Sequence, residues 1–352
     1  MESTRCNLCE TDDCARLLDA AGRSGSSIET FHIVRCKNCS LVYLNPRPEE
    51  GAILGFYPEG YHCRSFSLEE VDAQQLFGLP WRDAIERKYA SLLRLRSSGR
   101  VLDVGCGDGF LLKYLQEKGW DVMGIEPGNS TCAREILGLD VVQGSLDSAD
   151  FPAGSFDVIT LSHVLEHLHD PVATLQRVRY LLRDGGLVHI EVPNFDCLEA
   201  RLFDGSWIGI AAPLHLYHFT PNTLRATAER VGFHIVESGF VLPSPNQSPS
   251  FSESLRFFLA DRGWYRSGDE SSCGSTNEVP GGPTTMRWRT LRRLLHGSEA
   301  KAFYALSLLM NKVGRGSNIY VIASTRGSVF ACGDPVGPPT PSGRPCSTAG
   351  LR

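Results

Sequence analysis

The chain has 352 residues, of which 42% are hydrophobic and 21% charged; this ordinary globular composition excludes a disordered or membrane-embedded protein. Its formal net charge of -5 supplies no basic field over the whole molecule, which disfavours nucleic acid or anionic lipid as the main partner. The first ten residues contain no apolar core, and the longest apolar run, Ala302 to Met310, is far too short for a transmembrane segment. We therefore predict a cytoplasmic protein.

Four cysteines form two close pairs near the N-terminus, Cys6-x2-Cys9 and Cys36-x2-Cys39. Tetrahedral Zn²⁺ takes four ligands, and each C-x2-C turn lets two thiolates reach one ion. Four sulfurs leave no open position for water, so the pattern predicts a structural zinc site. Disulfides and free thiols are the alternatives, and both are disfavoured in a cytosolic protein.

Composition and periodicity divide the chain into five zones. They are a zinc-ribbon-like module (1–45), a connector with a helix near Pro80 (46–99), an α/β core (100–241), an insertion with short helices and a last strand (242–326), and a disordered tail (327–352). Within the insertion, helices are expected at Leu255–Leu259, Trp288–Leu295 and Ala302–Met310, and a strand at Asn318–Ser324.

Strands and helices alternate through the core, which is typical of an α/β fold with a mostly parallel sheet. Strands are expected at Val101–Val104, Asp121–Ile125, Asp140–Val142, Phe156–Leu161, Leu187–Val192 and Phe233–Val241. The helices are expected at Phe110–Lys118, from Asp170-Pro171 to Gly185-Gly186, and from Thr220-Pro221 to Gly232.

The most informative segment is VLDVGCGDGF, residues 101–110, in which an apolar strand runs into Gly105, Gly107 and Gly109. Glycines let the backbone turn sharply while a ligand approaches closely. A dinucleotide loop would need a third glycine where Phe110 stands, and Asp108 would repel a pyrophosphate. S-adenosylmethionine (SAM) carries no phosphate, and its ammonium and sulfonium suit Asp103 and Asp108. Glu126, at the end of the next strand, can accept both ribose hydroxyls.

The segments VLDVGCGDGF, MGIEP, QGSLDSADFPAGSFDVITLSHVLEHLHDP and LLRDGGLVHIEVPN together resemble the class I SAM-dependent methyltransferases. The resemblance implies a Rossmann-like seven-stranded sheet with an antiparallel last strand. It also implies cofactor-binding residues: Asp103, Gly105, Cys106, Gly107, Asp108 and Gly109 for the methionine part; Glu126 and Pro127 for the ribose; Gly144, Ser145 and Leu146 for the adenine; Ser162 and His163 where cofactor meets acceptor.

The order of a cysteine module, LVYLNPRP and this domain resembles bacterial enzymes that methylate sugar nucleotides, surface-glycan precursors or natural-product intermediates. Some of those relatives are sugar C-methyltransferases with a further complete C-terminal α/β domain. Only about 110 residues follow the sixth predicted strand here, so O- and N-methylation stay open.

Polar residues gather after the fourth and fifth predicted strands. His163, Glu166 and His167 spell the zinc-peptidase motif H-x-x-E-H, but that chemistry needs both histidines on one long helix, and here the motif follows a strand. We instead expect His163, His167, His215, Tyr217 and His218 to face the acceptor. A base is needed only if the acceptor must lose a proton, and otherwise alignment suffices.

Two other functions fit the same segments: methylation of RNA or protein with the zinc module as recognition arm, and a catalytically silent binding protein that keeps the fold. The sequence LSHVLEH after the fourth strand lacks an N-P-P-Y-type segment for gripping a flipped base, which argues against the first. The intact glycine loop and Glu126 argue against the second.

Overall fold

The structure is a computed structural model that describes residues 1–22, 29–57, 79–242, 250–262 and 304–326. The predicted helix at Trp288–Leu295 and the predicted disordered tail lie outside these residues. Within the described residues no helix is long and apolar enough to cross a membrane.

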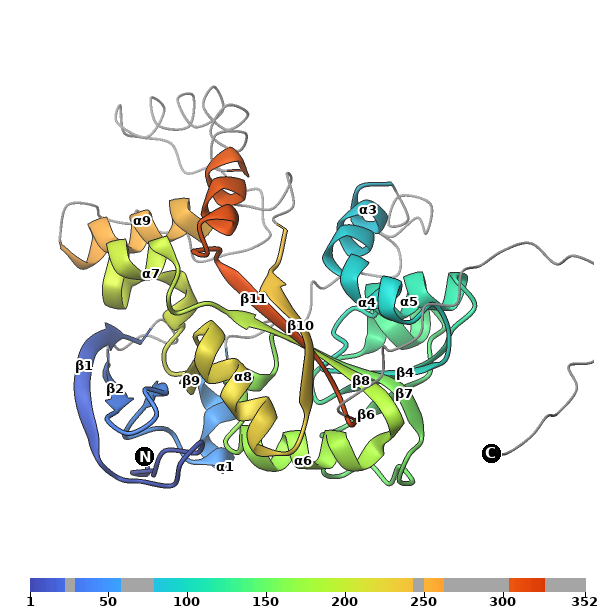
Figure 1. The fold of residues 1–352 in the computed structure, drawn as a ribbon. Coiled ribbons are helices and arrows are strands. Elements are labelled where there is room, and N and C mark those ends of the chain that lie inside the picture. Colours follow the sequence, from blue (N-terminus) through green and yellow to red (C-terminus); the bar gives the residue numbers. More distant parts are fainter. Residues whose placement is uncertain (23–28, 58–78, 243–249, 263–303, 327–352) are drawn as a thin grey trace, which may run out of the picture.

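Seven strands form one sheet in the order β10-β11-β8-β7-β4-β5-β6 (Figure 1). Neighbouring strands from β8 to β6 pair in parallel, whereas β11 lies antiparallel between β8 and β10. The strands are β4 (Arg100–Val104), β5 (Asp121–Glu126), β6 (Val141–Gln143), β7 (Phe156–Ser162), β8 (Leu182–Pro193), β10 (His234–Phe240) and β11 (Asn318–Ser324). The predicted seven-stranded α/β fold with an antiparallel last strand is confirmed.

Side-chain alternation along the strands divides the buried residues of the sheet between its two faces. Val101 and Val158 belong to one apolar cluster, while their neighbours Leu102 and Ile159 belong to the other. The first cluster is covered by α4 (Ala90–Leu95) and α5 (Phe110–Glu117), which follow α3 (Leu79–Lys88). The second is covered by α6 (Pro171–Leu181) and α8 (Pro221–Arg230). Both faces are therefore closed, as a parallel sheet requires.

Helix α6 begins as predicted but ends early. Asp170 is its N-cap and accepts a hydrogen bond from the Ala173 amide, with Pro171 in the first turn. The helix ends at Leu181, and β8 starts at Leu182 instead of the predicted Leu187. Leu182 pairs with Phe156 and Leu187 with Val158, so the glycines predicted to cap the helix lie in a register shift of the strand. Gly185 has a left-handed backbone there (φ +74°), which glycine adopts without strain.

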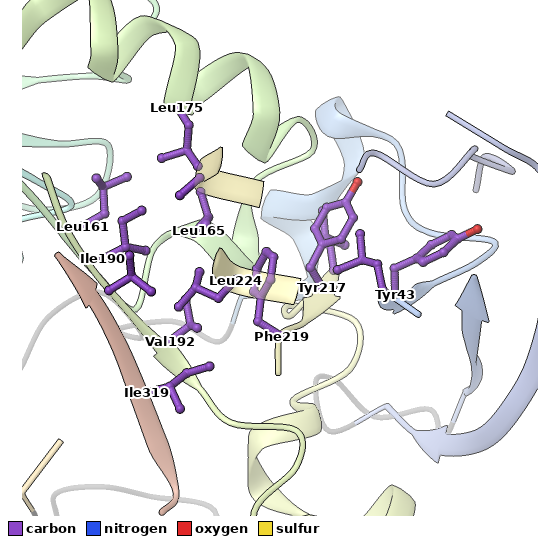
Figure 2. Packing of buried hydrophobic residues seen from close by; sticks show 14 of the residues in the cluster. Tyr43, Leu161, Leu165, Leu175, Ile190, Val192, Tyr217, Phe219, Leu224 and Ile319 are labelled. Carbon is purple, nitrogen blue, oxygen red and sulfur yellow. The ribbon is translucent and has the colours of Figure 1, made fainter. Parts of the chain in front are cut away.

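The N-terminal module is completed by a strand from the middle of the chain. Its sheet has the order β1-β2-β3-β9, with β1 (Cys14–Ala21), β2 (Thr30–Cys36), β3 (Val42–Leu44) and β9 (Tyr217–His218). Figure 2 shows the apolar packing continuing from Leu161 and Ile190 through Phe219 to Tyr217 and Tyr43. The module and one face of the large sheet thus share a single hydrophobic core.

Short elements surround this junction. After β3 come α1 (Glu50–Ile53) and the 3-10 turn η1 (Leu54–Phe56). After β8 come α7 (Leu198–Phe203), η4 (Asp204–Ser206) and η5 (Ile208–Ile210). From the insertion, α9 (Ser250–Asp261) packs on α7, where the Phe203 ring lies 5.0 Å from that of Phe251 and 5.6 Å from that of Phe258. A further helix spans residues 304–312 and leads into β11.

Candidate functional site

The glycine loop joins β4 to α5 with three left-handed residues, Gly105 (φ +69°), Gly107 (φ +52°) and Gly109 (φ +80°). A Cβ on Gly105 would lie 2.6 Å from Val164 Cγ2, and one on Gly109 would lie 2.7 Å from Leu139 Cδ1. A Cβ on Gly107 would meet nothing within 4 Å. Conformation therefore favours glycine at all three positions. Of these three glycines, only Gly107 has open space where a side chain would lie.

Two buried carboxylates stand at the ends of β4 and β5 beside this loop. Asp103 Oδ1 accepts a hydrogen bond from Thr160 Oγ1 at 2.6 Å. Burial raises the pKa of Asp103 to about 7. Glu126 accepts hydrogen bonds from the Gly107 amide at 2.8 Å and from the Gly128 amide at 2.7 Å. Glu126 thus fixes the glycine loop to the end of β5, a contact that the sequence did not indicate.

The other residues predicted to hold cofactor lie at the same edge of the sheet. Gly144 follows β6 and donates its amide to the Glu126 carbonyl at 3.0 Å. The Pro127 carbonyl accepts from Gln143 Nε2 at 3.1 Å. Ser145 is exposed and Leu146 is buried. Cys106 is buried in the loop, and a Cβ on Gly124 would lie 2.7 Å from its sulfur. The fold brings the carboxyl ends of three parallel strands together here, which is where open α/β sheets bind ligands.

A network of alternating charges lies at the carboxyl ends of β7 and β8 and includes Lys88 from the end of α3. Lys88 Nζ donates to Ser162 Oγ at 2.8 Å and lies 3.0 Å from Glu191 Oε2. Glu191 Oε1 lies 3.2 Å from His163 Nε2, and His163 Nδ1 lies 3.4 Å from Glu166 Oε1. Both glutamates are 1% exposed, whereas the His163 side chain is 41% exposed. His163 is the most exposed charged member of this network, followed by Lys88 at 26%.

The charged groups in this network shift one another's pKa values. Desolvation of the ring between two buried glutamates opposes the charged form of His163, but the carboxylates of Glu166 and Glu191 raise its pKa to about 9. Burial likewise opposes the ionised glutamates, yet His163 holds the pKa of Glu166 at about 2, and Lys88 with His163 holds that of Glu191 at about 2. His163 also has a left-handed backbone (φ +57°), and its amide donates to the Glu191 carbonyl at 2.9 Å.

Of the remaining predicted acceptor residues, His215, Tyr217 and His218 are buried and His167 is half-buried. His167 and His215 pack edge to face with ring centroids 4.6 Å apart. Burial lowers the pKa of His167 to about 3 and also lowers that of His215. Tyr217 and His218 form β9, and the Tyr217 hydroxyl accepts from Arg47 Nη1 at 3.0 Å and donates to the His169 carbonyl at 3.2 Å.

Tyr217 and His218, predicted to face the acceptor after the fifth strand, instead form a strand of the module sheet, in which Tyr217 pairs with Tyr43. We do not carry Tyr217 forward as a catalytic candidate, since its hydroxyl holds the module to the core. The H-x-x-E-H segment forms only the single 3-10 turn η3 (Leu165–His167) and is not the long helix of a zinc peptidase.

Sequence reasoning missed Lys88, Glu191 and Arg47 as parts of the site. The available signal for Glu191 was a carboxylate within the apolar strand LVHIEV, where an ionisable group must find a partner. Lys88 lies 103 positions before that partner, and nothing local in the sequence pairs them.

The four cysteines of the predicted zinc site converge at one end of the module. Their sulfurs all lie within 4.8 Å of one another. Cys6 Sγ is 3.3 Å from Cys39 Sγ, and Cys9 Sγ is 3.5 Å from Cys36 Sγ. Each close pair joins one cysteine from each C-x2-C turn, so the two turns face each other across a single point.

Comparisons with known proteins agree with this geometry. Residues 75–238 match a family model described as a methyltransferase domain. A ubiquinone biosynthesis O-methyltransferase of Nitrosococcus oceani is 37% identical over 123 residues, 33% of this chain and 50% of that protein. An uncharacterized methyltransferase of Schizosaccharomyces pombe is 25% identical over 244 residues, 62% of this chain and 76% of that protein.

Among solved structures, a SAM-dependent methyltransferase from Thermotoga maritima is similar with a TM-score of 0.44 and 15% identity, over 73% of this chain and 97% of that one. The chain spans half the length of the Nitrosococcus relative. The sheet order and the glycine loop define a Rossmann-like α/β domain. More particularly, residues 75–238 are similar to the methyltransferase domain that this family model describes.

Proposed function

We propose that the protein transfers a methyl group from SAM to a small-molecule acceptor. One observation carries the proposal: within the methyltransferase domain, three left-handed glycines and the buried carboxylates of Asp103 and Glu126 converge at the carboxyl ends of adjacent parallel strands. This donor set suits a cationic, phosphate-free nucleoside. Two carboxylates beside the loop would oppose a pyrophosphate and favour an ammonium or a sulfonium.

The predicted cofactor residues would bind different parts of SAM, according to their chemistry. Asp103 and the loop from Gly105 to Gly109 would hold the methionine part, with Gly107 on the open side of the loop. Glu126 would accept from the ribose hydroxyls, and its loop hydrogen bonds keep the carboxylate fixed for that purpose. Gly144, Ser145 and Leu146 would flank the adenine. When bound, SAM supplies an already activated methyl group.

On the acceptor side, the protein's contribution is alignment of the nucleophile with that methyl group. His163 is the residue we place against the acceptor, because its half-exposed imidazole is held from both sides by Glu166 and Glu191. Ser162, anchored by Lys88, fixes the backbone just before it. The arrangement gives a rigid polar group next to the donor site.

We further propose that Cys6, Cys9, Cys36 and Cys39 bind one structural Zn²⁺. Zinc–sulfur bonds of about 2.3 Å place tetrahedral sulfurs about 3.8 Å apart, close to the spacing of these four. The ion would tie together the turns on either side of β1 and β2, in a module with little core of its own.

Elemental analysis tests the zinc proposal. Zinc should be present in the purified chain, and Cys36→Ser should lose the equivalent held by the module and melt at a lower temperature. The matched control is Cys14→Ser, because Cys14 lies in β1 and outside the four-sulfur cluster. Retention of that equivalent by Cys36→Ser would refute the assignment.

The acceptor class is proposed as a small molecule with a hydroxyl or amine, such as a sugar nucleotide or a glycan or natural-product intermediate. The curated match to ubiquinone biosynthesis O-methyltransferases supports a small acceptor. Incubation with methyl-labelled SAM and separate pools of sugar nucleotides, quinone and phenol precursors, RNA and peptides tests this directly. Label in a small-molecule pool is the expected result, and label only in RNA or peptide would overturn the acceptor class.

A further inference from the structure

A second cluster of metal-ligating side chains lies in the acceptor region, formed by Glu166, His167 and His215. One ligand atom from each residue lies within 4.8 Å of the other two. We infer that these three residues bind a divalent transition-metal ion of the Zn²⁺ or Fe²⁺ type. The inference rests on their geometry and hydrogen bonds, and it is independent of methyl transfer.

Apart from its ion pair with His163, the buried carboxylate of Glu166 lacks the hydrogen-bond partners that a buried anion needs. Glu166 is 1% exposed, and neither of its oxygens accepts a hydrogen bond from any of the residues that the structure describes. In the ion pair with His163, Nδ1 is 3.4 Å from Oε1, outside good hydrogen-bond geometry. Buried polar atoms without partners are uncommon in native proteins and point to an ion or water at the site.

Both histidines are held in the form that ligates a metal through Nε2. His215 Nδ1 lies 2.9 Å from the Gly209 carbonyl, and His167 Nδ1 lies 3.1 Å from the Leu214 carbonyl. A carbonyl oxygen can only accept, so Nδ1 carries the proton in each ring and the lone pair is on Nε2. A backbone carbonyl on the far nitrogen is the usual support of a metal-bound histidine.

Two imidazoles and one carboxylate form a ligand set used by catalytic zinc sites and by non-haem iron. Metal bonds of about 2.0–2.1 Å bring such ligand atoms to roughly 3.4 Å from one another, so small side-chain rotations would close the present spacing. Three protein ligands leave a further position open. The nitrogen and oxygen donors also distinguish this site chemically from the four-sulfur cluster of the module.

Cobalt titration of the full chain tests the inference. Co²⁺ bound by cysteine gives sulfur-to-metal charge-transfer absorption, whereas Co²⁺ bound by histidine and carboxylate gives only the weaker visible bands. We expect two ions per chain, of which one contributes no charge-transfer absorption. His215→Gln and Glu166→Gln should each remove the second ion and keep the first. His234→Gln, which changes an exposed histidine on β10, should keep both.

The inference would be overturned if all the cobalt bound by the wild-type chain contributed charge-transfer absorption. This result is independent of whether the variants fold. Equal cobalt binding by wild type and His215→Gln would overturn it as well. Calorimetry with SAM on the same samples keeps the two proposals apart: absence of SAM binding would count against the proposed function and leave the metal count untouched.

Discussion

At the carboxyl ends of the strands of the large sheet, two regions are built in different ways. The donor half, formed by the loops after β4, β5 and β6, consists of short continuous segments such as 103–109 and 126–128. The acceptor half, formed by the loops after β7 and β8, is assembled from residues far apart in the chain. There Lys88 meets Glu191, and Tyr57 contacts His167 at 3.2 Å.

The halves differ in electrostatics too. Donor-side carboxylates are held by neutral donors, the Thr160 hydroxyl and backbone amides. On the acceptor side, Glu191 and Glu166 are held by the cations Lys88 and His163. Lys88 also acts on Asp103 through its charge, but among the described residues no hydrogen bond joins the two sides there. Because their hydrogen-bond partners differ, we expect mutations to separate SAM binding from turnover.

His163→Gln should give the largest effect and separate the halves most sharply. Glutamine keeps a polar side chain but cannot form the two ion pairs to Glu166 and Glu191, so alignment of the acceptor is lost. We expect turnover to fall about 100-fold with little change in SAM affinity. Steady-state kinetics and calorimetry measure the two quantities. Turnover within a few fold of wild type would remove His163 from the acceptor contact.

Glu126→Ala should show the converse on the donor half. Loss of a charged hydrogen-bond acceptor is worth about 1.5–3 kcal/mol, so SAM should bind roughly 10- to 150-fold more weakly. The same change frees the Gly107 and Gly128 amides, whereas Glu126→Gln keeps one acceptor oxygen and should lose less. Unchanged SAM affinity in Glu126→Ala would show that the cofactor lies elsewhere.

The pKa of Asp103 predicts a pH dependence confined to the donor half. Burial raises this pKa to about 7, so below that pH the carboxyl is neutral in the free protein. A cationic ligand favours the ionised form, so SAM affinity should rise with pH, at most about tenfold per unit, and level off above about pH 7. Asp103→Asn should bind more weakly and without this slope between about pH 5.5 and 7. A wild-type Kd that is flat over this range would contradict the role.

Tyr217→Phe should give the smallest effect on turnover, because we place Tyr217 outside the acceptor half. The substitution removes hydrogen bonds to Arg47 and the His169 carbonyl, so unfolding should become easier by about 1 kcal/mol. Turnover should stay within a few fold, because the hydroxyl joins the module to the core. A turnover loss comparable with that of His163→Gln would restore Tyr217 as a catalytic candidate.

The contrast between local segments and long-range contacts also explains which features could be predicted from the sequence. The glycine loop, Glu126 and the cysteine pairs are local patterns whose spacing reflects one turn or one strand end, and the sheet followed from periodicity. The fate of Tyr217 could not be read in this way, because it depends on pairing with Tyr43, far away in the chain. The Lys88–Glu191 pair is likewise a product of tertiary packing, with no trace in either local segment.

Strand β9 has a consequence for how freely this architecture can be rearranged. Because Tyr217 and His218 complete the sheet that begins in the first 45 residues, the N-terminal segment is not an interchangeable attachment. Trimming it would bare the polar edge of β9 together with the apolar surface under Tyr217 and Phe219. A chimaera that takes residues 1–45 from a related enzyme must therefore also take the segment around β9 from that enzyme. A chimaera cut only after residue 45 would separate β3 from the strand that it pairs with.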